Sequence, residues 1–91
     1  MSRRIIVQNS EVTLSTATNL SKARLVRVLN DTAASIVLTI DDAAQAAARE
    51  DYDTKGSRTI TVGSLETIYL EKEPLETISG SGLKCTAIAR Q

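Results

Sequence analysis

The C-terminal part of the chain, residues 66–89, alternates between short strand-like segments and tight turns, and this pattern limits the fold most. Ile68 and Leu70 alternate with polar neighbours, which is the period of two that a half-buried strand shows. Pro74 ends this strand because proline has no amide hydrogen for a β-ladder. Gly80-Ser81-Gly82 then lets the chain turn through positive φ at little cost. This succession predicts an all-β domain.

Residues 83–90 are predicted to form the final strand. Alternation gives it two faces, with Leu83, Cys85, Ala87 and Ala89 toward the core and Lys84, Thr86, Ile88 and Arg90 outward. Cys85 is the single cysteine of the chain, so it has no internal disulfide partner. Because its register points it inward, we predict that it is a small core residue and not a reactive thiol.

Earlier segments show the same apolar alternation and are predicted to be strands. They are residues 3–7, 12–14, 23–29, 35–40 and 59–62. Residues 23–29 are apolar on both faces, which predicts a central strand or a strand whose outer face contacts another surface. In the later strands, the side chains expected to face the core are Ile36, Leu38, Ile40, Ile60 and Val62.

The sequence Asn30-Asp31-Thr32 lies between two of these strands and is predicted to be a hairpin turn. Short strands separated by turns at intervals of about ten residues are typical of sandwiches and small barrels. We therefore expect one domain, residues 1–91, folded as a small antiparallel β-sandwich of Ig-like or jelly-roll-like type.

Residues 41–55 interrupt the strand pattern. The segment opens with two acids, which suit the positive end of a helix, and continues with alanines of high helix propensity. An isolated helix this short is marginal in water, so we predict a long loop that carries a short helical turn against another surface. Loops of this length in compact domains usually have a function. The candidate partner contacts in this loop are Asp42, Gln45, Arg49, Asp51 and Tyr52.

The N-terminal residues 2–8 offer a second candidate contact. They are predicted to form an arm that adds a strand to a neighbouring protein, where main-chain hydrogen bonds supply affinity. The alternative is an ordinary first strand of the sandwich. The candidate contacts in this segment are Arg3, Arg4, Ile5 and Ile6.

The chain has no phenylalanine, tryptophan or histidine, and two tyrosines are its aromatic residues. The core therefore has to come from Ile, Val, Leu and Ala, whose side chains fill small volumes. Small domains with thin cores often gain stability by association. We expect a homo-oligomer, with a trimer as one candidate.

Eleven basic residues balance eleven acidic residues, so no net charge favours binding to nucleic acid or to an anionic membrane. No apolar run approaches the ~18–20 residues of a membrane span, and the N-terminus has no signal-peptide pattern. We expect a protein that is made or assembled in a cytoplasm, without nucleic acid or membrane partners.

The absence of histidine excludes the Ser-His and Cys-His arrangements of nucleophilic catalysis, and no carboxylate pair stands out for acid–base chemistry. Residues 51–56 resemble the start of a calcium-binding loop. However, Lys55 occupies a ligand position, and Val62 stands where a bidentate glutamate is required. We expect no enzyme activity, no metal and no cofactor.

Two segments carry a resemblance to a known family. Residues 24–40 contain Val26-Arg27-Val28-Leu29-Asn30, a turn and an apolar strand. Residues 60–89 contain the run LEKEPLETI, followed by a turn rich in glycine and serine. Together they resemble small virion structural proteins of tailed phages, especially phages of marine bacteria and cyanobacteria. Glu76 stands where the family pattern has an aspartate, and residues 41–55 are longer than the hairpin expected there.

The resemblance implies a β-sandwich that is displayed in many copies on a capsid, or built into the neck or tail, and that carries no catalytic residues. The leading expectation is a capsid decoration (cement) protein that binds the major capsid protein or other virion proteins. It would be located on the capsid surface after assembly in the host cytoplasm.

Other functions remain as alternatives to capsid decoration. They are a neck, tail or fibre-adaptor component, a module that binds host-surface glycans, and a regulatory protein absent from virions. Glycan sites commonly use aromatic faces, and the presence of two tyrosines alone makes the glycan-binding alternative less favoured.

Overall fold

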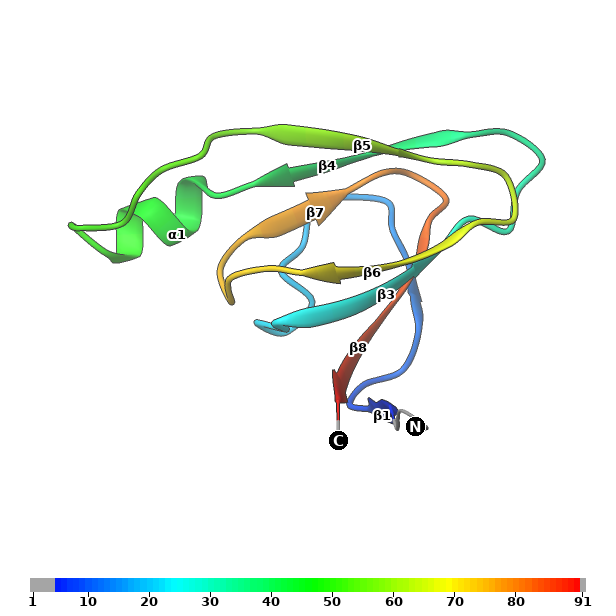
Figure 1. Ribbon diagram of the computed structural model, residues 1–91, viewed down its shortest axis with the longest axis horizontal. Helices are drawn as coiled ribbons and strands as arrows, with labels where there is room; N and C mark the ends of the chain where they lie inside the picture. The colour runs from blue at the N-terminus through cyan, green and yellow to red at the C-terminus, as the bar shows by residue number, and fades with distance from the viewer. Residues whose placement is uncertain (1–4, 91) are drawn as a thin grey trace.

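The computed structural model describes residues 5–90, including the side chains of residues 6–89. This part of the chain forms two antiparallel sheets that pack as two layers, with one short helix at one end (Figure 1). The predicted all-β sandwich is therefore confirmed. Its elements are β1 (Ile5–Val7), β2 (Val12–Thr13), β3 (Leu25–Leu29), β4 (Ile36–Asp41), α1 (Ala43–Ala48), β5 (Arg58–Val62), β6 (Thr67–Glu71), β7 (Thr77–Ser79) and β8 (Lys84–Arg90).

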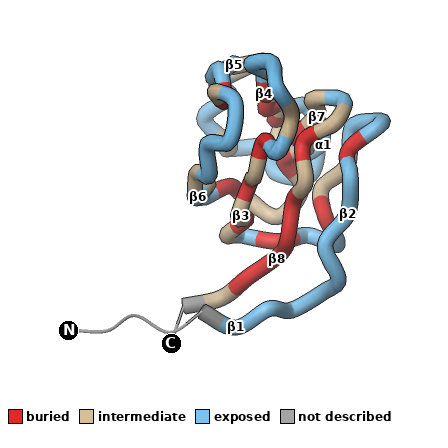
Figure 2. The backbone as a smooth tube through the Cα atoms, turned by 90° about the vertical axis from the view of Figure 1, so that its right-hand side faces the viewer, coloured by how far each residue is buried: buried red, intermediate tan, exposed pale blue. Residues whose placement is uncertain are grey.

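The larger layer has the strand order β1-β8-β3-β6, with β2 also paired to β8, and the smaller layer has the order β5-β4-β7. Figure 2 shows the two layers, and β8 runs out of the larger one at its C-terminal end. The first half of β8 lies opposite β2 and β3, where Val28 is registered with Cys85. Its last three residues pair with β1 outside the body of the sandwich.

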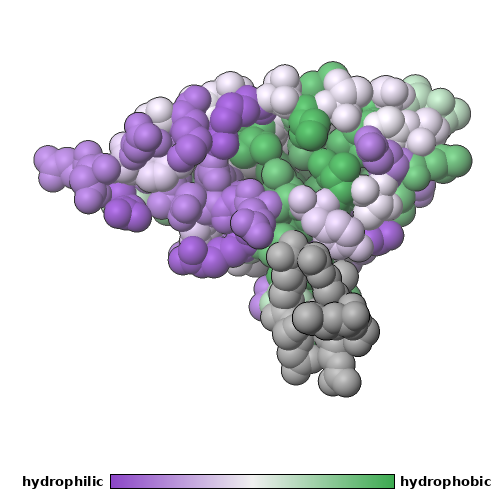
Figure 3. All heavy atoms as spheres, viewed as in Figure 1, coloured by the Kyte–Doolittle hydropathy of each residue, from purple (hydrophilic) through white to green (hydrophobic). Residues whose placement is uncertain are grey.

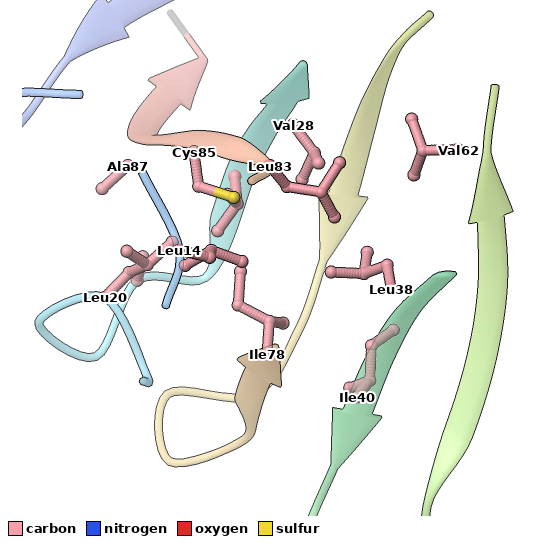
Figure 4. Packing of buried hydrophobic residues seen from close by; sticks show 12 residues of the cluster. Leu14, Leu20, Val28, Leu38, Ile40, Val62, Ile78, Leu83, Cys85 and Ala87 are labelled. Carbon is pink, nitrogen blue, oxygen red and sulfur yellow. The ribbon is translucent and has the colours of Figure 1, made fainter. Parts of the chain in front are cut away.

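The core between the layers is aliphatic, as the composition predicts. Each fully buried Val, Leu or Ile side chain contributes about 1.5–3 kcal/mol. Figure 4 shows these side chains converging from both sheets. The buried cluster consists of Leu14, Leu20, Ala23, Val26, Val28, Leu38, Ile40, Val62, Ile78, Leu83, Cys85 and Ala87.

Cys85 is fully buried, which confirms its predicted place in the core. Burial raises the pKa of its thiol to about 12, and the negative charge of Glu11 adds to this increase. The thiolate is therefore scarce at neutral pH, so the side chain serves packing and not reactivity.

Thr86 and Ile88, which were predicted to lie on the face of the last strand opposite Cys85, are both buried, at 6% and 3% exposure. β3 pairs with residues 84–87 of β8 and β1 pairs with residues 88–90, so each of the two residues has a paired strand beside it. Thr86 lies opposite Arg27, and Ile88 lies opposite Val7. Their burial shows that this face of β8 is covered at both positions, which period-two alternation does not predict.

The prediction that Ile60 is a core residue is also wrong, because 47% of it is exposed. Ile60 is registered with the buried Leu38, so it lies on the core side of its sheet. However, β5 is the edge strand of the smaller layer, so one side of Ile60 has no neighbouring strand among the described residues. The sequence predicted correctly that Ile60 points to the core side of its sheet, but it did not predict that the side chain would stay exposed to solvent.

The predicted hairpin at Asn30-Asp31-Thr32 does not form, because β3 and β4 belong to different sheets. Asn30 is fully buried and makes this segment a corner between the layers. Its side-chain Nδ2 donates hydrogen bonds to the carbonyl oxygens of Ala34, at 2.8 Å, and Val62, at 2.9 Å. Its Oδ1 accepts from the backbone N and the hydroxyl of Thr32, at 3.0 and 2.6 Å. Four hydrogen bonds thus fix the path from one layer to the other.

Replacing Asn30 with alanine is expected to lower the free energy of unfolding by about 1–3 kcal/mol, because the buried carbonyl of Val62 loses its donor. Urea unfolding followed by circular dichroism measures this change. The neighbouring Asp31→Ala is the matched control. It removes a partly exposed ion pair with Lys84 (2.8 Å) and is expected to cost at most about 1 kcal/mol. Equal losses in the two variants would contradict the corner role of Asn30.

Candidate interaction surfaces

The residues predicted to contact partners fall at two distant points of the chain, the N-terminal segment and the loop after β4. Arg3 and Arg4 lie outside the described residues, and Ile5 is described by its backbone alone. The remaining candidates divide into exposed side chains, which are available to a partner, and buried side chains, which hold the fold together.

A two-stranded ribbon, formed by β1 and residues 88–90 of β8, projects from the body of the sandwich (Figure 2). We call it the terminal ribbon. Its pairing is antiparallel, with Ile6 opposite Ala89, and it is continued by the hydrogen bond from Gln8 N to Ala87 O at 2.9 Å. Residues 5–7 therefore form a first strand on their own chain. Ile6 is 46% exposed and Val7 is 64% exposed, so the ribbon presents apolar side chains to solvent.

The loop after β4 is closed at its base by the carboxylate of Asp42, which is 1% exposed. The two carboxylate oxygens accept hydrogen bonds from the backbone N of Lys55, at 2.6 Å, and of Gly56, at 3.0 Å. The hydrogen bond from Lys55 is the main reason that the pKa of Asp42 is lowered, while burial acts in the opposite direction. Gly56 has φ of +78°, a left-handed conformation that glycine adopts without strain.

The predicted helical turn in this loop is confirmed as α1, which begins after a turn in which the Asp41 carboxylate accepts from Ala43 N at 2.7 Å. Gln45 on this helix is 5% exposed, and its Oε1 accepts a hydrogen bond from Leu75 N at 3.1 Å. This contact attaches the helix to the connection between β6 and β7. Asp42 and Gln45 therefore act inside the fold and do not form part of an exposed contact surface.

Tyr52 is half-buried, and the Lys55 ammonium lies 5.3 Å from the centre of its ring. Its hydroxyl is buried and interacts with the carboxylate of Asp42. Burial, together with the negative charges of Glu76 and Asp42, raises the pKa of this hydroxyl. Tyr52 therefore packs the inner side of the loop.

Arg49 and Asp51 are the predicted contacts of this loop that stay on the surface. Their side chains are 58% and 82% exposed and form an ion pair at 3.6 Å. A surface pair of this kind contributes about 0–1 kcal/mol, so it leaves both groups free to exchange partners.

A polar hollow of about 490 Å³ at the same end of the molecule was not predicted. Its central residue, Lys72, is 7% exposed, and its Nζ donates to the carbonyl oxygens of Glu73 and Pro74, each at 3.3 Å. Burial lowers the pKa of Lys72 to about 8, against the opposing effect of Glu76. The residues that line the hollow are Arg24, Leu25, Lys55, Arg58, Glu71, Lys72, Glu73 and Glu76.

Most charges of this hollow are bound to groups of their own chain. Glu76 forms an ion pair with Arg58 and accepts a hydrogen bond from Glu73 N at 2.7 Å. These contacts fix the connection between β6 and β7, next to the anchor of α1. The sequence signal for this cluster was the run of acids and lysine around Pro74, at residues 71–76. Which of these charges become buried depends on the loop that packs against them.

Among residues 5–90, no three histidine, cysteine, aspartate or glutamate side chains are grouped to hold a metal ion. In the same part of the chain, no helix is long and apolar enough to cross a membrane.

Comparison with known proteins adds no relative to this description. No protein-family model, no curated protein and no solved structure matches the chain.

Replacing Asp42 with asparagine is expected to loosen the base of the loop, because one of its two acceptor oxygens becomes an amide donor facing a backbone N–H. Hydrogen exchange at the amides of Lys55 and Gly56 should become faster. Asp53→Asn, in an exposed position of the same loop, is the control and should leave both rates unchanged.

The wild-type loop should respond to acid in the same way. Because the pKa of Asp42 is lowered from 3.8, its stabilising effect is complete above that value and is lost as the pH falls through the lower folded-state pKa. The quantity to compare is the protection of the Lys55 and Gly56 amides relative to their intrinsic exchange rate at each pH. Protection that is unchanged by acid and by Asp42→Asn would contradict the proposed anchor.

Proposed function

We propose that this protein is a structural component of a tailed-phage virion, and that it decorates the capsid by binding the major capsid protein. The proposal starts from the resemblance of residues 24–40 and 60–89 to small phage virion proteins. The structural observation that carries it is the terminal ribbon, which holds Ile6 and Val7 outside the core of its own chain.

The ribbon has the properties that a docking element on a shell requires. Its strand β1 is paired to β8 on one side and forms the end of the larger sheet, so its other edge faces outward. A capsid strand added there would gain main-chain hydrogen bonds, and the apolar side chains would supply burial. Because a shell repeats the same site many times, each contact of this kind can be modest.

The body of the sandwich is well fixed and can hold the terminal ribbon in place as a scaffold. Hydrogen bonds of Asn30 and Asp42 hold its two ends, and the aliphatic cluster fills the space between its layers. The charged groups of the polar hollow are engaged in fixing a connection between strands. These features support a protein whose function depends on shape and exposed edges.

The two tyrosines favour this proposal over glycan binding. Tyr69 is 51% exposed on β6, whereas Tyr52 is half-buried in the loop after β4. The two rings therefore do not form a shared exposed platform on one element, which sugar recognition by stacking would use.

The proposal is tested with capsids that lack this protein, to which the purified chain is added. The double variant Ile6→Glu/Val7→Glu is expected to bind such capsids at least about tenfold more weakly, because two apolar side chains lose favourable burial. Both positions are exposed, so the unfolding temperature should change little.

Val37→Glu is the matched control, because Val37 is 52% exposed on the opposite side of β4 from the buried Leu38. It should bind like the wild type. Equal binding by the ribbon variant and the wild type would contradict the docking role of the ribbon, and no binding by the wild type would contradict capsid decoration.

A further inference from the structure

Of the four strands at the ends of the two sheets, β1 belongs to the terminal ribbon, and the other three differ in how they are protected from pairing with other chains. β7 is covered, because Thr18 and Ile78 exchange two backbone hydrogen bonds at 3.1 and 2.8 Å. β6 has Glu66 directly before it and Glu71 at its end. Natural proteins use such charges and covering segments to block edge-to-edge association.

β5 is open over its middle three residues, Thr59–Thr61, which are all exposed. Arg58 opens the strand with a charge that is paired to Glu76, and Val62 at the other end is buried with its carbonyl bound to Asn30. β5 pairs with β4 on one side, and the described strands leave its other edge without a partner. From Thr59 to Leu65 the chain carries no charged residue and no proline. Three successive exposed residues that are uncharged and β-branched form a template for another strand.

The side of the sandwich that carries β5 is also apolar. β5 and β6 lie together on this side, one from each layer (Figure 2), and Figure 1 looks directly onto it. In the same view, Figure 3 shows apolar residues gathered between the two layers. Ile60 is 47% exposed here, and the half-buried Ile68 and Leu70 pack against the core. We call these three residues the apolar seam.

We propose that β5 pairs with β5 of a second copy of this chain, antiparallel and centred on Ile60, which closes the apolar seam. This register places Ile60 opposite the partner's Ile60, and Thr59 opposite the partner's Thr61. Ile–Ile and Thr–Thr are favourable cross-strand pairs. The smaller sheets of the two copies then form one continuous sheet with the order β7-β4-β5-β5-β4-β7.

The exposed residues Thr59-Ile60-Thr61 read the same in both directions, which favours a second copy as the occupant. In this register Arg58 lies opposite the partner's Val62, so the two arginines do not meet. They are separated by about 13 Å along the strands, at about 3.3 Å per residue. Arg58 is also paired with Glu76 of its own chain. The edge is thus complementary to itself, which a two-fold symmetric contact requires.

This pairing is independent of the proposed function, because it uses β5 and leaves the terminal ribbon free. Residues 5–7 lie at the opposite end of the larger sheet from β6. A dimer would therefore present two ribbons at once.

Sedimentation velocity of the full chain over a wide concentration range tests the pairing. The wild type is expected to form a dimer. Ile60→Lys and Ile60→Glu should each be monomeric over the same range, with a dissociation constant at least about tenfold larger, because each variant places like charges opposite each other. Val37→Lys, on the outer face of the neighbouring strand, is the matched control and should dimerise like the wild type.

An equimolar mixture of Ile60→Lys and Ile60→Glu provides the sharpest result. In the proposed register the lysine faces the glutamate, so the mixture should form a dimer that neither variant forms alone. A mixture that stays monomeric would overturn the register. A wild type that is monomeric throughout, that forms a trimer, or whose dimer survives Ile60→Lys would overturn the pairing itself.

Hydrogen exchange of the unmodified chain tests the pairing without any variant, so its result does not depend on whether a variant folds. Amide exchange in β5 should slow as the protein concentration rises, whereas exchange in β7 should not change. Rates in β5 that are independent of concentration while the wild type dimerises would place the interface elsewhere. Failure of this test leaves capsid binding by the ribbon unaffected, so the two proposals are judged separately.

Discussion

The side chain of Asn30 joins the two sheets at the corner between β3 and β4. Its amide reaches Ala34 within the corner and Val62 at the end of β5, while its oxygen holds Thr32. The backbone N of Asn30 donates to Glu66 O at 2.9 Å, which connects the same residue to the start of β6. One buried polar residue thereby positions the strands of both layers, and a core without large aromatic side chains depends on such fixed points.

The opposite end of the sandwich is held by a different set of polar contacts. Asp42 closes the loop that contains α1, Gln45 fixes the helix to Leu75, and Glu76 links Arg58 to the same connection. Both ends of the sandwich are thus fixed by hydrogen bonds and ion pairs. The two long sides differ from each other, since the segment around Thr18 covers β7 and the apolar seam lies open beside β5.

Alternation of apolar and polar residues located most strands correctly, because each strand has one face toward a shared core. It could not predict that β8 would be buried on both faces or that Ile60 would lack cover, since these depend on the position of a strand within its sheet. The corner at Asn30 was mistaken for a hairpin because a turn signal does not say whether the strands beside it will pair.

The structure leaves some of the candidate contact residues exposed and buries others, because exposure depends on tertiary contacts. The loop and its helix followed from composition, but the burial of Asp42 results from an approach to Lys55 and Gly56 that local sequence does not encode. We propose that exposed edges carry the function of this protein, as a repeated component of a virion shell.

The most direct measurement is the number of copies of this protein per purified virion, determined by quantitative mass spectrometry against the major capsid protein. The account predicts a copy number comparable with that of the capsid protein. A copy number typical of the neck or tail would contradict its place on the shell, and complete absence from virions would contradict the account as a whole.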